Sequence, residues 1–211
     1  MAQYFAVHPT HPQPRLIRQA AAIVRGGGLI AYPTDSCYAL GCHLGDADAQ
    51  RRLRRVRGVD DKHHLTLMCL DLSQLAAYAI CDNAQYRVMK AVTPGPYTFI
   101  LRATREVPRR LLHPRRKTIG VRIAAHAAAR ALLAELGEPM LSATLQLPGD
   151  AAPLADARAI RSRLEHELDL VVDGGACGTV PSTVVDLTGD LPVVLRAGKG
   201  ALEALGPVSA L

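Results

Sequence analysis

Apolar residues along the chain follow two patterns, helical spacing in some segments and short continuous runs in others. Residues 14–24 have helical spacing, and four apolar residues share one face: Ile17, Ala20, Ala21 and Val24. The glycines at 26–28 end this helix, and the apolar run at 29–32 follows as a buried strand. A second helix is predicted after Asp46, which can cap it, with a buried stripe of Ala49, Leu53 and Val56.

The later segments continue this mixture of elements. Further strands are predicted at residues 65–70, 97–101, 118–123, 140–144, 169–172, 183–187 and 192–196. Short helices are predicted after Asp71 and Asp82, and longer ones at 127–136, where Gly137 ends the pattern, and at 157–168.

The order of these elements predicts the fold class. The strands at 97–101 and 118–123 have no helix between them, so we expect them to pair antiparallel, unlike strands of a doubly wound parallel sheet. The prediction is an α/β fold with a twisted mixed sheet and flanking helices. With 211 residues, no repeats and no Ser/Gly-rich linker, the chain is expected to form a single domain over residues 1–211.

Composition excludes several classes of function. No run of about 18 apolar residues occurs and the start does not resemble a signal peptide, so we expect a soluble, cytoplasmic protein without a membrane partner. The five cysteines lack CxxC spacing, which disfavours a disulfide framework and a zinc site. Cys37 has no neighbouring His or Asn signature of a nucleophile. The eight histidines show no HExxH motif, so no protein-bound transition metal is expected and most are assigned to the surface.

A net charge of +6, carried mostly by arginine, indicates acidic ligands or partners, although an arginine-rich composition can also reflect the base composition of a genome. Neither GxxxxGK[ST] nor GxGxxG is present, so phosphates would have to be bound by scattered side chains. Candidate donors near the ends of predicted elements are Arg55, Arg57, Lys62, Arg122 and Arg196. Arg51, Arg52 and Arg54 are better explained as a solvated helix face.

Hydroxyl side chains are a second group of candidate ligand-binding residues. The segment YPTDSCYALG at 32–41 places Thr34 and Ser36 where a buried strand ends, a favoured place for a ligand site in α/β proteins. Within it, Asp35 could orient a substrate ammonium or fix the turn, and the turn is favoured slightly. Thr118 and Arg122 are four apart on a strand, and Ser142 and Thr144 two apart, so each pair shares one face.

Four segments in order resemble the YrdC/YciO family of threonylcarbamoyl-AMP synthases, most closely its YciO branch. They are YPTDSCYALG at 32–41, TPGPYTFIL at 93–101, KTIGVR at 117–122 and PSTVVDLTGDLPVVLRAG at 181–198. The resemblance implies a sheet curved around a deep, positively charged cleft. It also implies synthesis of threonylcarbamoyl-AMP and pyrophosphate from ATP with Mg²⁺, L-threonine and bicarbonate, for t⁶A modification of tRNA.

The same resemblance implies residue roles. The catalytic residues would be Arg55, Arg57 and Lys62. ATP would be bound by Arg55, Arg57, Thr118, Ser142, Thr144 and Arg196. Threonine would be bound by Thr34, Arg122 and Ser182.

The chain departs from the family pattern at three places: Arg55 replaces the lysine of a Lys-x-Arg motif, Gln146 replaces an asparagine, and a histidine is missing near 66–69. These departures leave two alternatives open. One is a related ATP-dependent enzyme with a different acceptor. The other is a protein that binds double-stranded RNA or tRNA through a basic concave surface, extended by Arg105, Arg109, Arg110, Arg115, Arg116 and Lys117.

Overall fold

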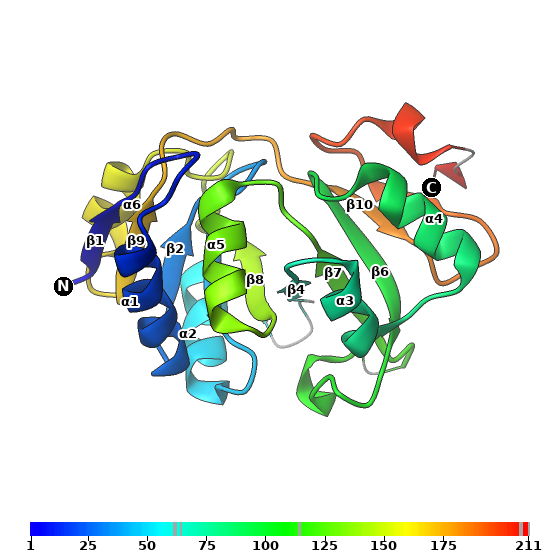
Figure 1. Ribbon diagram of the computed structural model, residues 1–211, viewed down its shortest axis with the longest axis horizontal. Coiled ribbons are helices and arrows are strands. Elements are labelled where there is room, and N and C mark those ends of the chain that lie inside the picture. The colour runs from blue at the N-terminus through cyan, green and yellow to red at the C-terminus, as the bar shows by residue number, and fades with distance from the viewer. Residues whose placement is uncertain (61–62, 64, 114, 207–208, 211) are drawn as a thin grey trace.

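The computed structural model describes residues 1–60, 63, 65–113, 115–206 and 209–210, which form one β-sheet with helices against it (Figure 1). The strands are β1 (Gln3–Ala6), β2 (Ile30–Tyr32), β3 (Ala39–His43), β4 (Thr66–Met68), β5 (Ala79–Ile80), β6 (Tyr97–Ala103), β7 (Thr118–Arg122), β8 (Met140–Thr144), β9 (Leu170–Asp173), β10 (Thr183–Asp186), β11 (Val193–Arg196) and β12 (Ser209–Ala210). The α-helices are α1 (Pro14–Arg25), α2 (Ala47–Arg57), α3 (Leu72–Tyr78), α4 (Asn83–Val92), α5 (Ala127–Leu136) and α6 (Ala157–Leu164), and short 3₁₀ helices occupy Arg109–Leu111 and Leu202–Leu205.

The sheet is mixed, as the sequence predicts. Its strand order within the described residues is β1-β9-β2-β3-β8-β4-β7-β6-β10-β11-β12, with β5 paired to β6 outside this path. β6 and β7 pair antiparallel with Phe99 opposite Val121, which confirms the expected pairing, whereas β4–β7 and β6–β10 are parallel. Strands from distant parts of the chain thus become neighbours at the centre of the sheet.

The helix boundaries follow from capping. Carboxylates accept backbone N–H bonds at the predicted starts of α2, α3 and α4: Asp46, Asp71 and Asp82. Gly58 and Gly137 end α2 and α5 with positive φ, a conformation that glycine adopts without steric cost. None of the helices in the described ranges is long and apolar enough to cross a membrane.

Two apolar clusters cover opposite parts of the sheet. In one, α1 and α5 pack together beside β2, β8 and β9, through residues such as Val24, Leu132 and Tyr32. The other joins α2, α3, α4 and α6 to the sheet, through residues such as Leu53 and Phe99. Figure 1 shows α1, α2 and α5 in one half of the molecule and α3 and α4 in the other half.

The sequence interpretation did not predict four strands, β1, β3, β5 and β12, and it placed one helix end too late. β1 is held by parallel pairing to β9, more than 160 residues away, which no local pattern reveals. β3 falls inside the segment assigned to a ligand loop, and its Gly41 is required because a Cβ there would lie 2.8 Å from side-chain atoms of Tyr32 and Met140. The helix predicted at 157–168 ends at Leu164, whose carbonyl accepts from the N–H groups of both Glu167 and Leu168.

Most thiols lie in the core. Cys37, Cys42 and Cys69 are buried, and all five cysteines are free thiols. Burial raises the pKa of Cys42 and of Cys69 to about 12, so both stay protonated at neutral pH.

His126 caps α5, and this cap depends on the protonation state of its imidazole. Its Nδ1 accepts the N–H of Ala128 at 3.2 Å, which requires the unprotonated nitrogen. Burial lowers the pKa of His126 from its ordinary value of 6.5, against the opposing charge of Asp35 and a backbone hydrogen bond to Gly174. The unfolded chain therefore binds a proton at a higher pH than the folded chain does, and the stability that the neutral ring provides is lost as pH falls below about 6.5.

We predict that the unfolding free energy of the wild type decreases between about pH 7.5 and about pH 5.5 by more than that of His126→Asn, which retains a capping side chain but does not titrate. Urea titrations at the two pH values measure the difference. His11→Asn, in an exposed loop, is the matched control and should behave as the wild type does. Identical pH dependence in the wild type and His126→Asn would show that His126 is not the titrating group.

Candidate functional site: a basic pocket lined with hydroxyl groups

The alternation of side chains along four strands creates a pocket. On β6 and β7, Phe99 and Val121 point into the apolar core, whereas Thr98 and Gly120 face a cavity of about 310 Å³. β4 and β8 contribute to the same lining through Thr66, Met68, Ser142 and Thr144. Strands with one apolar and one polar face thus explain both the core and the pocket.

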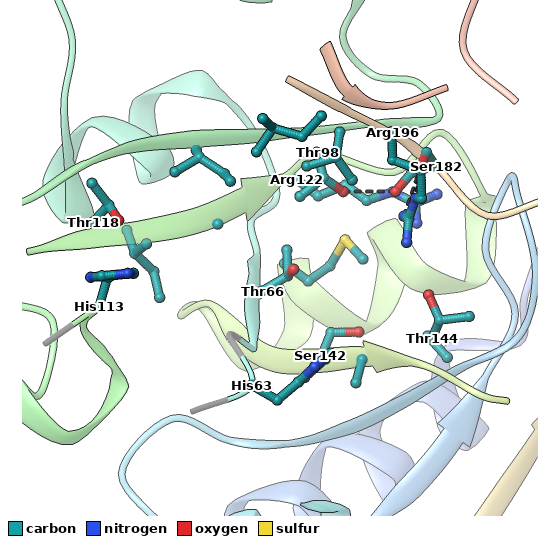
Figure 2. A pocket seen from close by; sticks show the side chains of 18 of the residues that line it. His63, Thr66, Thr98, His113, Thr118, Arg122, Ser142, Thr144, Ser182 and Arg196 are labelled. Atoms are coloured by element: carbon teal, nitrogen blue, oxygen red, sulfur yellow. Dashed lines mark hydrogen bonds between the residues drawn. The ribbon is translucent and has the colours of Figure 1, made fainter. Parts of the chain in front are cut away.

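Loops and strand ends complete the lining. Arg57 comes from the end of α2, Ser182 precedes β10, and Arg196 ends β11. Figure 2 shows Thr98, Arg122, Ser182 and Arg196 together at one end of the pocket and Thr118 beside His113 at the other. The pocket therefore has a cationic end and a distant end with a hydroxyl and an imidazole.

Arg122 is the most deeply buried cation of the pocket, with 6% of its surface exposed. Its Nη2 donates to Asp35 Oδ1 at 2.6 Å, Ser36 Oγ at 3.0 Å and Thr34 Oγ1 at 3.3 Å. A buried guanidinium is stable only when paired in this way. Three consecutive residues of the turn after β2 therefore position the last residue of β7.

Part of the Arg122 guanidinium remains available to a ligand. Every hydrogen bond recorded for its side chain among the described residues uses Nη2, and Nε is buried without a partner there, so Nη1 is the nitrogen that a ligand can reach. A planar fork with free N–H groups binds a carboxylate or phosphate well. Arg122 is thus suited to an anionic group at the cationic end.

Arg196 and Arg57 add two further guanidiniums. Arg196 donates through Nε and Nη2 to the Ser182 carbonyl at 3.2 and 2.8 Å, and Arg57 donates through Nη1 to the Gln146 carbonyl at 2.5 Å. Burial lowers the pKa of both from their ordinary value, and for Arg196 the charges of Arg122 and Arg57 lower it further. Three arginines close enough to influence one another favour an anion between them.

The hydroxyls that line the pocket differ in availability. Ser142 Oγ donates to the Leu40 carbonyl at 3.1 Å and lies 2.7 Å from Tyr32 Oη, and Ser182 Oγ lies 2.8 Å from Thr98 Oγ1. By contrast, the structure records no hydrogen bond for three hydroxyls of described pocket residues: Thr66, Thr118 and Thr144. These three are free to bind the oxygens of a ligand.

The structure brings most of the predicted site residues together. Seven of them line this pocket: Arg57, Thr118, Arg122, Ser142, Thr144, Ser182 and Arg196. Thr34 does not line the pocket but supports Arg122, while its hydroxyl donates to the Cys37 carbonyl at 2.6 Å. Lys62 lies outside the described residues.

Arg55 is the exception, and the prediction that it joins Arg57 in the site is not supported by its position. Residues two apart on a helix point about 200° apart, so Arg55 and Arg57 cannot share a face of α2. Arg55 is instead exposed and pairs with Glu167 at 2.8 Å. Gln146 also points elsewhere, since its amide donates to the Asp150 carbonyl.

The sequence interpretation missed several lining residues. His63 and His113 line the pocket but were not predicted as site residues, and Arg116 also lines it while pairing with Asp186 at 3.0 Å. Met68 lies in the segment 66–69, near which the family resemblance implies a histidine, and it contributes a thioether to the lining. The two histidines and Arg116 reach the pocket through the paths of their loops, which the sequence does not reveal. Met68 could have been predicted, because it lies two residues after Thr66 on one strand and so shares its face.

The loop between β6 and β7 is tied to α2. Arg110 donates to the carbonyls of Leu44 and Gly45 at 3.3 and 2.9 Å and to Gln50 Oε1 at 3.1 Å. This loop carries His113 and Arg116, so the contact fixes the distant end of the pocket. Among the described lining residues there is no carboxylate.

The mixed sheet with flanking helices defines an α/β protein, and its pocket is lined by clustered arginines and open hydroxyls. The profile of the Sua5/YciO/YrdC family, described as "Telomere recombination", matches residues 22–198, and the chain belongs to this family. This confirms the resemblance seen in the sequence.

Relatives match over most of their length. The chain is 54% identical to the uncharacterised protein YciO of Escherichia coli K12 over 203 residues, 96% of this chain and 98% of that protein. It is 36% identical to the threonylcarbamoyl-AMP synthase of Chromobacterium violaceum over 180 residues, 85% of this chain and 92% of that protein.

Solved structures show the same single-domain α/β fold. Escherichia coli YciO matches with a TM-score of 0.94 at 53% identity, over 97% of this chain and 100% of that chain. Sua5 of P. abyssi in complex with L-threonine matches with a TM-score of 0.90 at 28% identity, over 99% of this chain and 62% of that chain.

We predict that Asp35→Ala destabilises the fold by about 3 kcal/mol, because it leaves the Arg122 charge buried with two hydroxyls and no carboxylate. Urea unfolding measures this change. The matched control, Glu167→Ala, removes the exposed partner of Arg55 and should cost under about 1 kcal/mol. Equal losses in the two variants would contradict the assigned importance of the buried pair.

Proposed function

We propose that the pocket binds ATP with Mg²⁺, bicarbonate and an amino acid, L-threonine in the reaction of the named relatives, and forms threonylcarbamoyl-AMP and pyrophosphate. The observation that carries this proposal is the convergence of Arg57, Arg122 and Arg196 on one cavity with open threonine hydroxyls. Similarity to threonylcarbamoyl-AMP synthases and to a Sua5 structure with L-threonine supports it. The product would supply the t⁶A modification of tRNA.

The reaction requires two bond-forming steps. The amine of the amino acid attacks the carbon of bicarbonate and water leaves, which gives a carbamate. A carbamate oxygen then attacks the α-phosphorus of ATP, and pyrophosphate leaves with the electrons of the broken P–O bond. Since the carbamate is already an anion, the second step needs positioning and charge neutralisation rather than a general base.

Each pocket residue has a role that fits its position. Arg122 would bind the substrate carboxylate through its free N–H groups, while Thr34 and Asp35 hold it in place. Arg57 and Arg196 would neutralise the phosphates as charge moves to the leaving pyrophosphate.

Hydroxyls would orient the rest of the substrates. Thr144 and Ser142 would bind phosphate or ribose oxygens near the centre, and Thr118 the nucleoside part of ATP at the distant end. Ser182 would contact the amino acid. Lys62 stays a sequence-based expectation for the phosphates.

We predict that Arg57→Ala weakens ATP binding at least tenfold, whereas Arg55→Ala changes it less than twofold, because only Arg57 reaches the pocket. Calorimetric titration of Mg²⁺·ATP measures the affinities. Pyrophosphate release with ATP, bicarbonate and threonine tests the activity itself. Absence of release under conditions where a homologous synthase turns over would reject the proposed reaction, and equal effects of the two substitutions would reject the assignment of Arg57.

A second candidate function, binding of double-stranded RNA or tRNA, is favoured by the exposed arginines of the β6–β7 loop beside the distant end of the pocket. Arg105, Arg109 and Arg115 are exposed there. Arg110 and Arg116 are less suitable than the sequence suggested, because Arg110 holds α2 and Arg116 pairs with Asp186.

We predict that replacing Arg105, Arg109 and Arg115 with Gln reduces the slope of log affinity against log salt for duplex RNA by roughly 2 to 3, because up to three phosphate contacts are lost. Filter binding at several salt concentrations measures the slope. An unchanged slope would show that this loop does not contact RNA.

A further inference from the structure

Met68 forms a wall beside the anion-binding arginine. Met68 and Arg122 are register partners on the parallel strands β4 and β7, so their side chains project side by side from the same face of the sheet. Both line the pocket, and Met68 is only 1% exposed. An amino acid whose carboxylate binds Arg122 therefore places its side chain close to a thioether.

Met68 packs within an apolar cluster. Ala39 belongs to the same buried cluster as Met68 and also lines the pocket. The hydroxyls near Arg122 are already engaged: Thr34 donates to the Cys37 carbonyl, and Thr98 and Ser182 bond each other at 2.8 Å. A substrate hydroxyl directed at the Met68 thioether would lose water and gain only a weak sulfur acceptor, because the nearest open hydroxyl along β4 belongs to Thr66, two residues earlier.

We propose that Met68 sets the acceptor preference of this pocket, and that the acceptor is an α-amino acid with a small apolar side chain. This inference rests on the proposed function, because it takes Arg122 as the carboxylate site. The chain would accept L-valine or L-2-aminobutyrate at least as well as L-threonine. An apolar wall rejects an isostere with an added hydroxyl by at most about 100-fold, so valine should be favoured over threonine by between onefold and about 100-fold.

The test compares L-threonine, its isostere L-valine, and L-2-aminobutyrate. Affinities are measured by calorimetry with Mg²⁺ and α,β-methylene-ATP, which blocks pyrophosphate loss, and initial rates by pyrophosphate release with ATP and bicarbonate. D-Valine controls for non-specific binding. We expect valine and 2-aminobutyrate to match or exceed threonine in both measurements.

Two variants isolate the role of Met68. Met68→Gln has nearly the same volume and adds hydrogen-bonding groups, and it should shift the threonine-to-valine ratio toward threonine by about tenfold or more. Met68→Leu adds no such group and should keep the wild-type ratio. Thermal unfolding without ligand shows whether each variant is folded. The threonine-to-valine ratio does not depend on the fraction of active protein, because both substrates are measured on the same sample.

The outcomes separate this inference from the proposed function. Release driven by threonine tenfold better than by valine would overturn the role of Met68 alone and would place the Thr98–Ser182 hydroxyls on the substrate side chain. Wild-type ratios in Met68→Gln would also overturn it. Absence of amino-acid binding and of pyrophosphate release with every acceptor would overturn both proposals.

Discussion

The geometry of the pocket depends on the buried guanidinium of Arg122. It ends β7, in the half of the molecule that carries α3 and α4, yet its partners are Thr34, Asp35 and Ser36 in the turn after β2. A buried charge is unstable without those partners. The bonds therefore hold the end of β7 against the turn after β2. The bonds that stabilise the fold use only Nη2, and they leave Nη1 of this pocket-lining residue without a partner among the described residues.

The pocket and the core are two faces of the same strands. Because β4, β6 and β7 place Leu67, Phe99 and Val121 against the helices, the intervening residues must face the concave side. On that side the chain has threonines, a glycine and an arginine instead of a second apolar layer. Gly120 keeps part of this space open because it has no side chain. A Cβ at this position would lie 3.3 Å from Thr66 Oγ1. The pocket is therefore lined by the residues that alternate with the core residues along these strands.

Local signals in the sequence predict most of the helices and the face on which site residues lie, but not what distant segments contribute. Asp46, Asp71 and Asp82 cap helices through bonds within three residues, which is why those starts are predictable. β1 and β3 depend on pairing with distant strands, and His113 reaches the pocket only through the path of its loop. The motif placed Arg55 beside Arg57 because it specifies only their spacing along the chain. On a helix, residues two apart point in different directions, and Arg55 lies away from the pocket.

The attachment of the β6–β7 loop to α2 bears on how molecules enter and leave the pocket. Arg110 makes three hydrogen bonds to Leu44, Gly45 and Gln50, and Gln50 is itself buried and donates to the Leu44 carbonyl. Swinging this loop aside would break these bonds to a charged group together, which makes such openings infrequent. On this side, the rate at which a molecule enters or leaves the pocket would then depend on a contact whose own residues do not line the pocket.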